Sequence, residues 1–248
     1  MKRYDIVFSL GEDCAYASYM KLAHIRRVSG PFDWLTHASF EERFRLLTNN
    51  FSDFLNKDDF CFLQKDPNMF NDESCDYYEN RRTQFYFYHD FMINVPFEQS
   101  FNTVKEKYRR RIERFYNLIM KNKNVLFIWF SHDTNTDNAV IKSLCNDFCD
   151  KMNKVFDFLI IENDCVLGCP VKTIISENII KYNLCTMKHG DNPTMGNVSE
   201  VLPLFKEVCL RKRYVFIRKA LEITSKIVCP FIFYKPIRKK VKKILRKY

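Results

Sequence analysis

Two nearly continuous apolar runs, Val125–Phe130 and residues 156–161, constrain the fold of this chain more than any other feature. Runs of this length and composition are typical of strands that are buried on both faces of a sheet. Residues 137–153 lie between the two runs and place their apolar side chains on one face of a helix. A strand, a helix and a second strand in this order predict parallel pairing through a right-handed crossover.

The beginning of the chain fits the same scheme. Residues 4–10 predict a strand, and residues 14–24 are rich in Ala, Met and Leu, which favour a helix. Between them, Gly11 turns the chain and Asp13 is a suitable N-cap, which places Cys14 in the first helical turn. The opening of the chain is therefore predicted to be a strand, a tight turn and a helix.

The remaining elements follow from local patterns. The sequence predicts further helices near residues 40–48 and from Thr103, where Glu106 completes a capping box. It also predicts strands at residues 84–91 and 171–176, and a polar loop over residues 56–80. Together these elements predict an α/β fold, a three-layer sandwich around a mostly parallel sheet of the SGNH or Rossmann type. We expect one such domain over residues 1–212 and a basic tail over residues 213–248.

Composition restricts the class of protein. The chain has 248 residues, of which 46% are hydrophobic, and this is enough to bury the core of one large domain. The first apolar run is too short for a signal peptide, and no run approaches the length of a membrane span. Ten cysteines are scattered singly, which favours reduced thiols and a cytoplasmic protein. Two pairs have C-x-x-x-C spacing, Cys145 with Cys149 and Cys165 with Cys169, but a zinc site needs four ligands, so we expect no metal.

The C-terminal tail differs from the rest of the chain. From Lys235 to Tyr248 there are eight Lys or Arg and no acid, which accounts for most of the formal net charge of +10. Apolar residues alternate with these charges at helical spacing, which favours contact with an anionic membrane surface at the inner face of the cell membrane. The aromatic residues precede the charges, so we expect no nucleic-acid partner.

The local chemistry of Cys14 makes it the best candidate for a nucleophile. Ligands of open α/β sheets bind at the carboxyl ends of strands, where Cys14 is predicted to lie. The free amides of the helix start, in the segment that includes Gly11, Asp13 and Ala15, favour a thiolate and could hold an oxyanion. The carboxylates of Glu12 and Asp13 oppose this by raising the pKa of the thiol. The alternative is a small buried cysteine that packs at the helix start.

Five histidines could supply a base, and their positions leave the choice open. His24 lies ten residues after Cys14 on the predicted helix, about 15 Å along its axis. Strand alternation places His89 on an aromatic, buried face and turns Asp90 to the other face, unless the strand bulges there. His132 and Asp133 follow a predicted strand, at the sheet edge where active-site loops collect. The other histidines are His37 and His189.

A run of arginines marks the helix that is predicted to start at Thr103. Arg109, Arg110, Arg111 and Arg114 are predicted to form its solvated face, as is usual for an amphipathic helix. The alternative is a phosphate-binding face, which would suit a glycosyltransferase that uses a nucleotide sugar.

Four segments carry a family resemblance: residues 8–22 (FSLGEDCAYASYMKL), 29–35 (SGPFDWL), 87–91 (FYHDF) and 104–115 (VKEKYRRRIERF). Over residues 5–165 the chain resembles a bacterial family described as putative papain-like cysteine peptidases, whose members often occur among genes for capsule or lipopolysaccharide synthesis. The resemblance implies a nucleophile at Cys14 and a catalytic histidine at His89. The third residue stays open between Asp90, Asn94 and Asp133, and the secondary candidates are Asp33, His132 and Asp133.

The resemblance also implies an alternative fold, the papain-like α+β arrangement. The predicted strand–turn–helix around Cys14 is more similar to the nucleophile site of SGNH hydrolases, with Cys in place of Ser, and to a capsule-synthesis acetyltransferase family. We therefore expect a thiol-dependent acyl-transfer enzyme, a hydrolase or an acyltransferase, that acts on a glycan or an acylated small molecule in surface-polysaccharide synthesis. No cofactor is expected, although acetyl-CoA or another acyl donor could serve. The alternatives are a non-catalytic, membrane-associated glycan-binding or scaffold protein and a glycosyltransferase.

Overall fold

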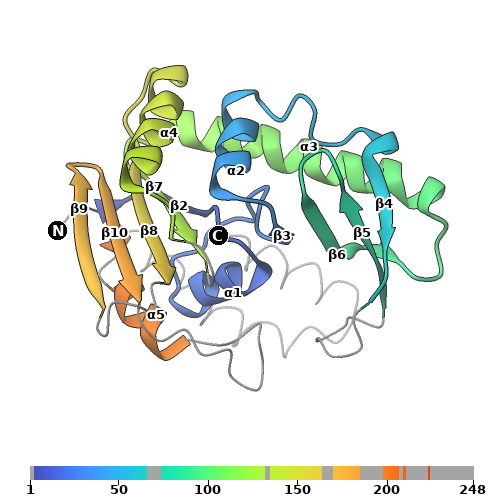
Figure 1. The fold of residues 1–248 in the computed structure, drawn as a ribbon, viewed down its shortest axis with the longest axis horizontal. Helices are drawn as coiled ribbons and strands as arrows, with labels where there is room; N and C mark the ends of the chain where they lie inside the picture. The colour runs from blue at the N-terminus through green and yellow to red at the C-terminus, as the bar shows by residue number, and fades with distance from the viewer. Residues whose placement is uncertain are drawn as a thin grey trace.

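A mostly parallel sheet forms the centre of the molecule (Figure 1). The computed structural model describes residues 3–65, 74–131, 135–163, 170–184, 198–206, 209–210 and 223. Within these residues the sheet has the order β2-β7-β8-β10-β9. Its parallel strands are β2 (Ile6–Ser9), β7 (Val125–Phe130), β8 (Asp157–Asn163) and β10 (Ile179–Leu184), and β9 (Val171–Ser176) is the antiparallel edge strand. The predicted α/β class with a mostly parallel sheet is confirmed.

Helices cover both faces of this sheet. One face carries α2 (Phe40–Thr48), α3 (Phe97–Lys121) and α4 (Asn138–Lys151), and the other carries α1 (Cys14–Leu22) and α5 (Val198–Lys206). Side chains of a strand alternate between the faces, so Ile6 and Phe8 join the first core and Val7 joins the second. The helices thus form layers on both sides of the sheet. A specific likeness to SGNH, Rossmann or papain folds stays a prediction.

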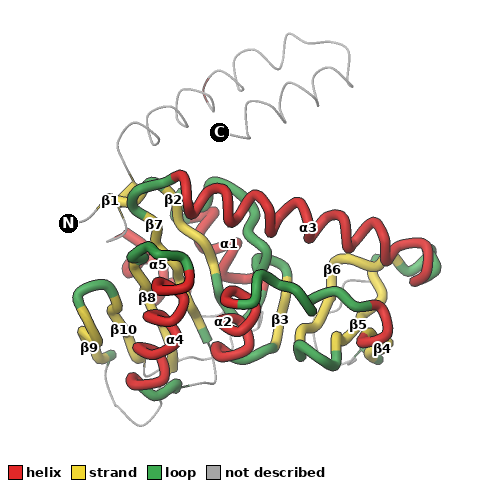
Figure 2. Tube along the Cα trace, turned by 90° about the horizontal axis from the view of Figure 1, so that it is seen from above, coloured by secondary structure: helices red, strands yellow, loops and turns green. Residues whose placement is uncertain are grey.

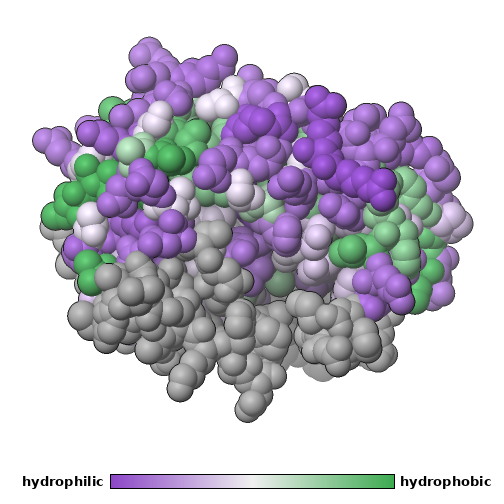
Figure 3. Space-filling model, viewed as in Figure 1, coloured by the Kyte–Doolittle hydropathy of each residue, from purple (hydrophilic) through white to green (hydrophobic). Residues whose placement is uncertain are grey.

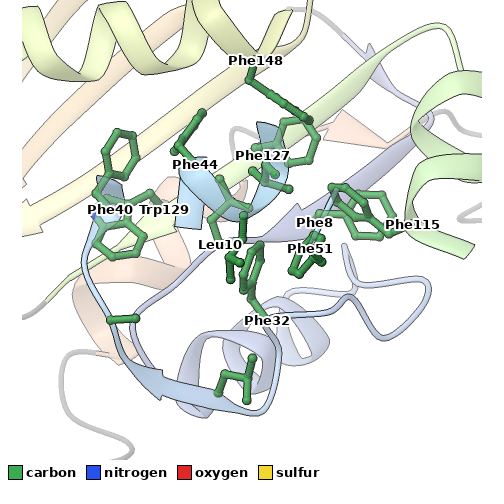
Figure 4. Packing of buried hydrophobic residues seen from close by; sticks show 14 of the residues in the cluster. Phe8, Leu10, Phe32, Phe40, Phe44, Phe51, Phe115, Phe127, Trp129 and Phe148 are labelled. Atoms are coloured by element: carbon green, nitrogen blue, oxygen red, sulfur yellow. The ribbon is translucent and has the colours of Figure 1, made fainter. Parts of the chain in front are cut away.

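The first core consists largely of phenyl rings that contact one another, some edge to face and some stacked (Figure 4). Phe127 of β7 lies 5.5 Å from the ring of Phe158 on the neighbouring strand and 5.7 Å from that of Phe148 on α4. Phe8 of β2 meets Phe115 of α3 edge to face, with 4.8 Å between ring centres. Each such pair contributes about 0.5–1.5 kcal/mol beyond the burial of its surface. The phenylalanines of this core therefore serve mainly to join helices to the sheet.

A second, antiparallel sheet lies beside the first and has the order β3-β6-β5-β4. Its strands are β3 (Leu35–His37), β4 (Phe60–Leu63), β5 (Cys75–Asn80) and β6 (Phe85–Met92), and the short helix η1 (Lys57–Asp59) precedes β4. The predicted loop over residues 56–80 is therefore wrong, because this segment contains β4 and β5. Strand pairing overrides the low strand propensity of its Asp, Glu and Asn residues. The polar side chains also find buried partners: the side-chain amide of Asn80 donates to the carbonyl of Phe54 at 2.9 Å.

The helix α3 connects the two sheets, and Figure 2 shows it running past both of them. Its second half packs Phe115 on β2, and its first half packs Phe101 against Phe60 of β4, with 5.4 Å between ring centres. The predicted start at Thr103 with a capping box is wrong. The helix begins at Phe97, after Pro96 at the N-cap, since Phe97 and Phe101 extend the apolar stripe by two turns.

The described surface in Figure 3 is mostly hydrophilic, with hydrophobic areas toward the ends where β9 and β4 lie. Both are edge strands with an exposed apolar side chain: Ile174 of β9 is 70% exposed and Phe62 of β4 is 61% exposed. A further short parallel pair joins β1 (Arg3–Tyr4) to β11 (Cys209–Leu210). No described helix combines the length and the apolar character needed to cross a membrane. The basic tail from Lys235 to Tyr248 lies outside the described residues.

Candidate functional site

The turn between β2 and α1 places Cys14 at the carboxyl end of a parallel strand, as predicted. Beyond β2, the amide of Glu12 donates to the carbonyl of Phe130 at 3.0 Å, which ties the turn to the end of β7. Gly11 sits so close to Tyr16 that a Cβ on it would lie 2.9 Å from the Cδ2 atom of that ring. A side chain at Gly11 would therefore force the turn and the helix apart.

Asp13 caps α1 and fixes its first turn. Its backbone is extended, with φ −141° and ψ 179°, and its carboxylate accepts from the amide of Ala15 at 2.7 Å. The amide of Gly11 donates to the hydroxyl of Ser9 at 3.1 Å. The amides of Gly11 and Ala15, two of the predicted oxyanion donors, are thus already engaged. The amide of Cys14 instead lies against its own thiol, where it favours the thiolate.

The thiol of Cys14 is held in its protonated form. Burial and, to a smaller extent, the negative charge of Asp13 together raise the pKa of Cys14 to about 12. Tyr19 of α1 and Tyr88 of β6 are electrostatic neighbours of this thiol, because a charge on Cys14 contributes to the raised pKa of both phenols. The sequence predicted that Asp13 would raise the pKa of the thiol, and it does. This effect is larger than the lowering of the pKa by the amide at the start of α1.

The histidine and aspartate that follow Tyr88 lie on a bulge of β6. Tyr78 pairs with Phe87 and Asp76 with Phe91, so three residues of β6 stand opposite Tyr77 alone. The bulge changes the predicted faces. The carboxylate of Asp90 turns to α3, where it is 1% exposed and binds Lys107 and Tyr108. His89 is only partly buried, and its ring meets that of Trp34 edge-on at 5.6 Å.

The other predicted site residues either contact partners of their own or lie outside the residues that the structure describes. Asp33 is 2% exposed and binds Arg26 through Oδ2, with 2.8 Å to Nε. His37 stacks on Tyr86, with 4.4 Å between ring centres. His132 and Asp133 lie outside the described residues, as do His189, Cys165 and Cys169.

The cysteines offer no described metal site. Cys145 and Cys149 lie on the buried face of α4, where they pack against the core. In the part of the chain that the structure describes, no three His, Cys, Asp or Glu side chains are grouped as ligands for a metal ion.

Arg43 of α2 lies directly beneath the turn, and the sequence did not identify it. Its guanidinium is fully buried and donates to the carbonyls of Glu12 at 3.3 Å and His37 at 2.9 Å. Its Nε and Nη1 atoms have no hydrogen-bond partner. Aromatic rings surround it, with the ring of Phe85 closest at 4.7 Å. Burial lowers the pKa of Arg43 to about 9, against the opposing effect of Glu12 and Asp13.

A buried ion pair lies at the same edge of the sheet. Glu162 of β8 and Lys181 of β10 are 0% and 3% exposed and lie 2.9 Å apart. Glu162 also accepts from the indole of Trp129 at 2.9 Å and from the amide of Thr136 at 2.8 Å. Lys181 also donates to Asn135 at 2.8 Å and to the carbonyl of Thr136 at 2.6 Å. The signal in the sequence that could have identified this pair is a charged residue within an apolar strand, Glu162 near the end of β8 and Lys181 inside β10.

Comparison with known proteins identifies a family for most of the chain. A family model described as "Putative papain-like cysteine peptidase" matches residues 5–162. An uncharacterized protein of Acanthamoeba polyphaga mimivirus is 25% identical over 139 residues, which is 52% of this chain. The chain spans 62% of the length of that relative. No solved structure matches the chain significantly. The matched segment contains Cys14 and β6 and covers more than half of the chain, so the protein belongs to this family of putative papain-like cysteine peptidases.

Proposed function

We propose that this protein is a cysteine-dependent hydrolase with Cys14 as its nucleophile. The family points to cysteine-based hydrolysis. The observation that carries the proposal is the position of Cys14: a partly exposed thiol at the first residue of α1, at the carboxyl end of a parallel strand. The residue type that hydrolysis requires thus stands at the sheet edge where α/β enzymes bind their substrates.

The raised pKa of Cys14 decides which mechanism we propose. With a pKa of about 12 the resting thiol carries its proton at neutral pH, so a preformed thiolate does not supply the nucleophile. A base must take the proton as the sulfur attacks, as a serine nucleophile also requires. We assign this base to His89. Asp90 serves as a positioning residue, because its bonds to Lys107 and Tyr108 fix the bulge that carries His89.

The proposed reaction has two stages. The sulfur of Cys14 forms a bond to the carbonyl carbon of an ester or amide, and its proton passes to His89. The amide of Cys14, which favours negative charge on its own sulfur, would also stabilise the developing oxyanion. The tetrahedral intermediate expels the alcohol or amine, which leaves with the proton from His89 and leaves a thioester on Cys14. Water, deprotonated by His89, then cleaves the thioester, and the released thiol recovers the proton.

Trapping the thioester tests this proposal. The wild-type protein is incubated with a panel of activated acyl esters and peptides, and each peptide that contains a cysteine is analysed by mass spectrometry after an acid quench. We expect a hydroxylamine-sensitive acyl group on Cys14 and loss of turnover in Cys14→Ala. Cys61→Ala is the matched control, since Cys61 is also a partly exposed free thiol. Turnover that survives in Cys14→Ala would overturn the proposal. A wild-type protein that shows neither turnover nor acylation of Cys14 would overturn it too and favour a non-catalytic scaffold or glycan-binding role.

A finer proposal is acyl transfer in surface-polysaccharide synthesis, with a glycan hydroxyl in place of the attacking water. The same nucleophile and base serve both reactions, so the support is the chemistry of Cys14 alone. An acyl donor such as acetyl-CoA would be the second substrate and no bound cofactor is needed. Addition of a sugar acceptor should then divert product from the free acid to the acylated sugar. An unchanged yield of free acid would leave hydrolysis as the reaction.

We further propose that the segment from Lys235 to Tyr248 holds the protein at the inner face of the cell membrane. The support is its sequence, with eight basic residues interspersed with apolar ones. Vesicles that contain an anionic lipid should retain the full chain in a sedimentation assay, and neutral vesicles should not. Removal of the segment should abolish retention, and retention without it would refute the proposal.

A further inference from the structure

Four cationic side chains gather where α3 meets β6 and the loop before β3. Lys107, Arg111 and Arg114 recur at helical spacing on α3, and Arg26 reaches the same place from the segment after α1. They are linked through shared neighbours, because Asp33 interacts with Arg26, Arg111 and Arg114. The predicted solvated face of α3 is confirmed for Arg109, Arg110 and Arg114, which are exposed, and is corrected only for Arg111, which is partly buried.

The two carboxylates of the cluster are already engaged. Asp33 accepts from Nε and Nη2 of Arg26 at 2.8 and 2.5 Å, and from the amide of Gly30 at 3.0 Å. Asp90 forms its ion pair with Lys107 and accepts from the hydroxyl of Tyr108 at 2.8 Å. Each carboxylate therefore neutralises one cation, and two of the four cations keep their charge.

Those two cations are Arg111 and Arg114, which form no ion pair with any described residue. The guanidinium of Arg111 lies 5.3 Å from the centre of the Tyr108 ring, and its Nη1 atom is buried without a hydrogen-bond partner. Arg114 donates only to a neutral group, the carbonyl of Ser29, at 2.8 Å. Burial lowers the pKa of Arg114, and the like charge of Arg111 lowers it further. An unsatisfied buried donor is costly, and a nearby anion would supply the missing acceptor.

We propose that Arg111 and Arg114 bind a phosphate group, with Lys107 and Arg26 as supporting charges. A phosphate ester carries about −1.5 to −2 charges at neutral pH, which suits the two guanidinium groups that form no ion pair. The fork of a guanidinium fits the oxygens of a phosphate. The partly exposed Trp34 lies beside the cluster, 5.8 Å from the Arg26 guanidinium and 5.6 Å from the ring of His89. The phosphate site would thus lie next to the proposed base.

This inference goes beyond the proposed hydrolysis and does not depend on it. A phosphorylated ligand would have its phosphate on Arg111 and Arg114 and its remaining part toward Trp34 and His89. Binding of the phosphate requires neither the thiol of Cys14 nor a covalent step. Cys14→Ala should therefore retain phosphate binding even where it loses all turnover, so the two proposals can fail separately.

Titration calorimetry with inorganic phosphate at low ionic strength tests the site. We expect saturable binding to the full-length protein that weakens at least about tenfold in Arg111→Gln, the effect of losing a charge-assisted hydrogen bond. Arg110→Gln is the matched control, because Arg110 is the exposed neighbour on the same helix and carries the same charge. It should bind within about twofold of wild type, as expected for a screened surface charge.

A second variant, a control for folding and a second ligand complete the experiment. Arg114→Gln repeats the test if Arg111→Gln unfolds, and circular dichroism establishes the fold of each variant. A hexose phosphate that binds more tightly than inorganic phosphate would identify a phosphate ester as the ligand, and equal affinity would identify free phosphate. Absence of saturable binding to wild type, or equal losses in Arg110→Gln and Arg111→Gln, would overturn the proposal and leave the cluster a structural network.

Discussion

Two buried charged sites lie on either side of the Trp129 indole at one edge of the main sheet, the ion pair of Glu162 with Lys181 and the guanidinium of Arg43. On one side, Glu162 accepts a hydrogen bond from the indole and pairs with Lys181, with further partners from Asn135 and Thr136. On the other side, the guanidinium of Arg43 lies 5.4 Å from the centre of the Trp129 ring. It leaves two nitrogen atoms without hydrogen-bond partners. One charged group is fully satisfied and the other is not.

The difference separates two roles for buried charge. A satisfied pair such as Glu162 and Lys181 fixes the structure around it, here the segment at Asn135 and Thr136 that leads from β7 into α4. Burial of an unsatisfied cation destabilises the folded state through lost solvation, and contacts with aromatic rings offset this loss only in part. Arg43 bears this cost directly beneath the turn that presents Cys14, and it binds the carbonyl of Glu12 in that turn. We therefore expect loss of the charge at the first site to reduce the free energy of unfolding more than loss of the charge at the second.

The largest expected effect comes from breaking the satisfied pair. Glu162→Ala leaves Lys181 charged and buried without its counterion, which typically costs about 3–5 kcal/mol of unfolding free energy. Urea denaturation followed by circular dichroism measures this loss. The double variant Glu162→Leu with Lys181→Met is the control, since it removes both charges and should recover most of the stability. If the double variant were as unstable as the single one, the hydrogen bonds and not the unpaired charge would be responsible.

The sequence predicted single elements of the fold better than it predicted either buried charge. The bounds of α2, β7 and β9 agree with their hydrophobic patterns, and so does the position of Cys14 after β2. These features depend on the local periodicity of hydrophobic residues and on helix-capping residues, which can be read directly from the sequence. The burial of Arg43 depends on partners from the turn, β3, β6 and β7, which only the folded chain brings together.

The bulge in β6 limits the prediction of the candidate site in the same way. Strict alternation places His89 and Asp90 on opposite faces with His89 inside, whereas the pairing with β5 inserts extra residues and turns Asp90 toward α3. Pairing register is a property of two strands, and β5 lies in a segment that its polar composition marked as a loop. The inward Arg111 and the exposed Arg110 differ for a similar reason, because the sequence does not show where β6 lies against α3.

A smaller effect is expected from removing the unsatisfied charge. Arg43→Met keeps much of the side-chain volume and removes both the two hydrogen bonds to carbonyls and the cost of burying the cation. These contributions oppose each other, so we expect a change in unfolding free energy within about 2 kcal/mol. Urea denaturation of Arg43→Met beside Glu162→Ala makes the comparison. A loss as large as that of Glu162→Ala would show that the aromatic rings satisfy the guanidinium fully.

The effect on stability that is smallest at neutral pH concerns the thiol itself. The folded protein holds the pKa of Cys14 at about 12, whereas a free thiol in the unfolded chain has a pKa of about 8.5. The folded state thus binds more protons between these values, so this group lowers stability as pH rises through that window and has no effect below it. Iodoacetamide labelling of Cys14 should accordingly keep accelerating with pH beyond pH 10, and level off earlier in the denatured protein.

Asp13→Asn then identifies the origin of that pKa. Asparagine preserves the N-cap of α1 and removes the charge that is the second cause of the shift, after burial. Labelling of Cys14 should accelerate at a fixed alkaline pH, while burial keeps it slower than in the denatured chain. Arg43→Met is the control: burial and Asp13 are the causes that raise the pKa, so labelling should stay at the wild-type rate. Slower labelling in Arg43→Met would instead show that the unsatisfied guanidinium acts on the thiol through the turn, and that its charge serves the chemistry of Cys14.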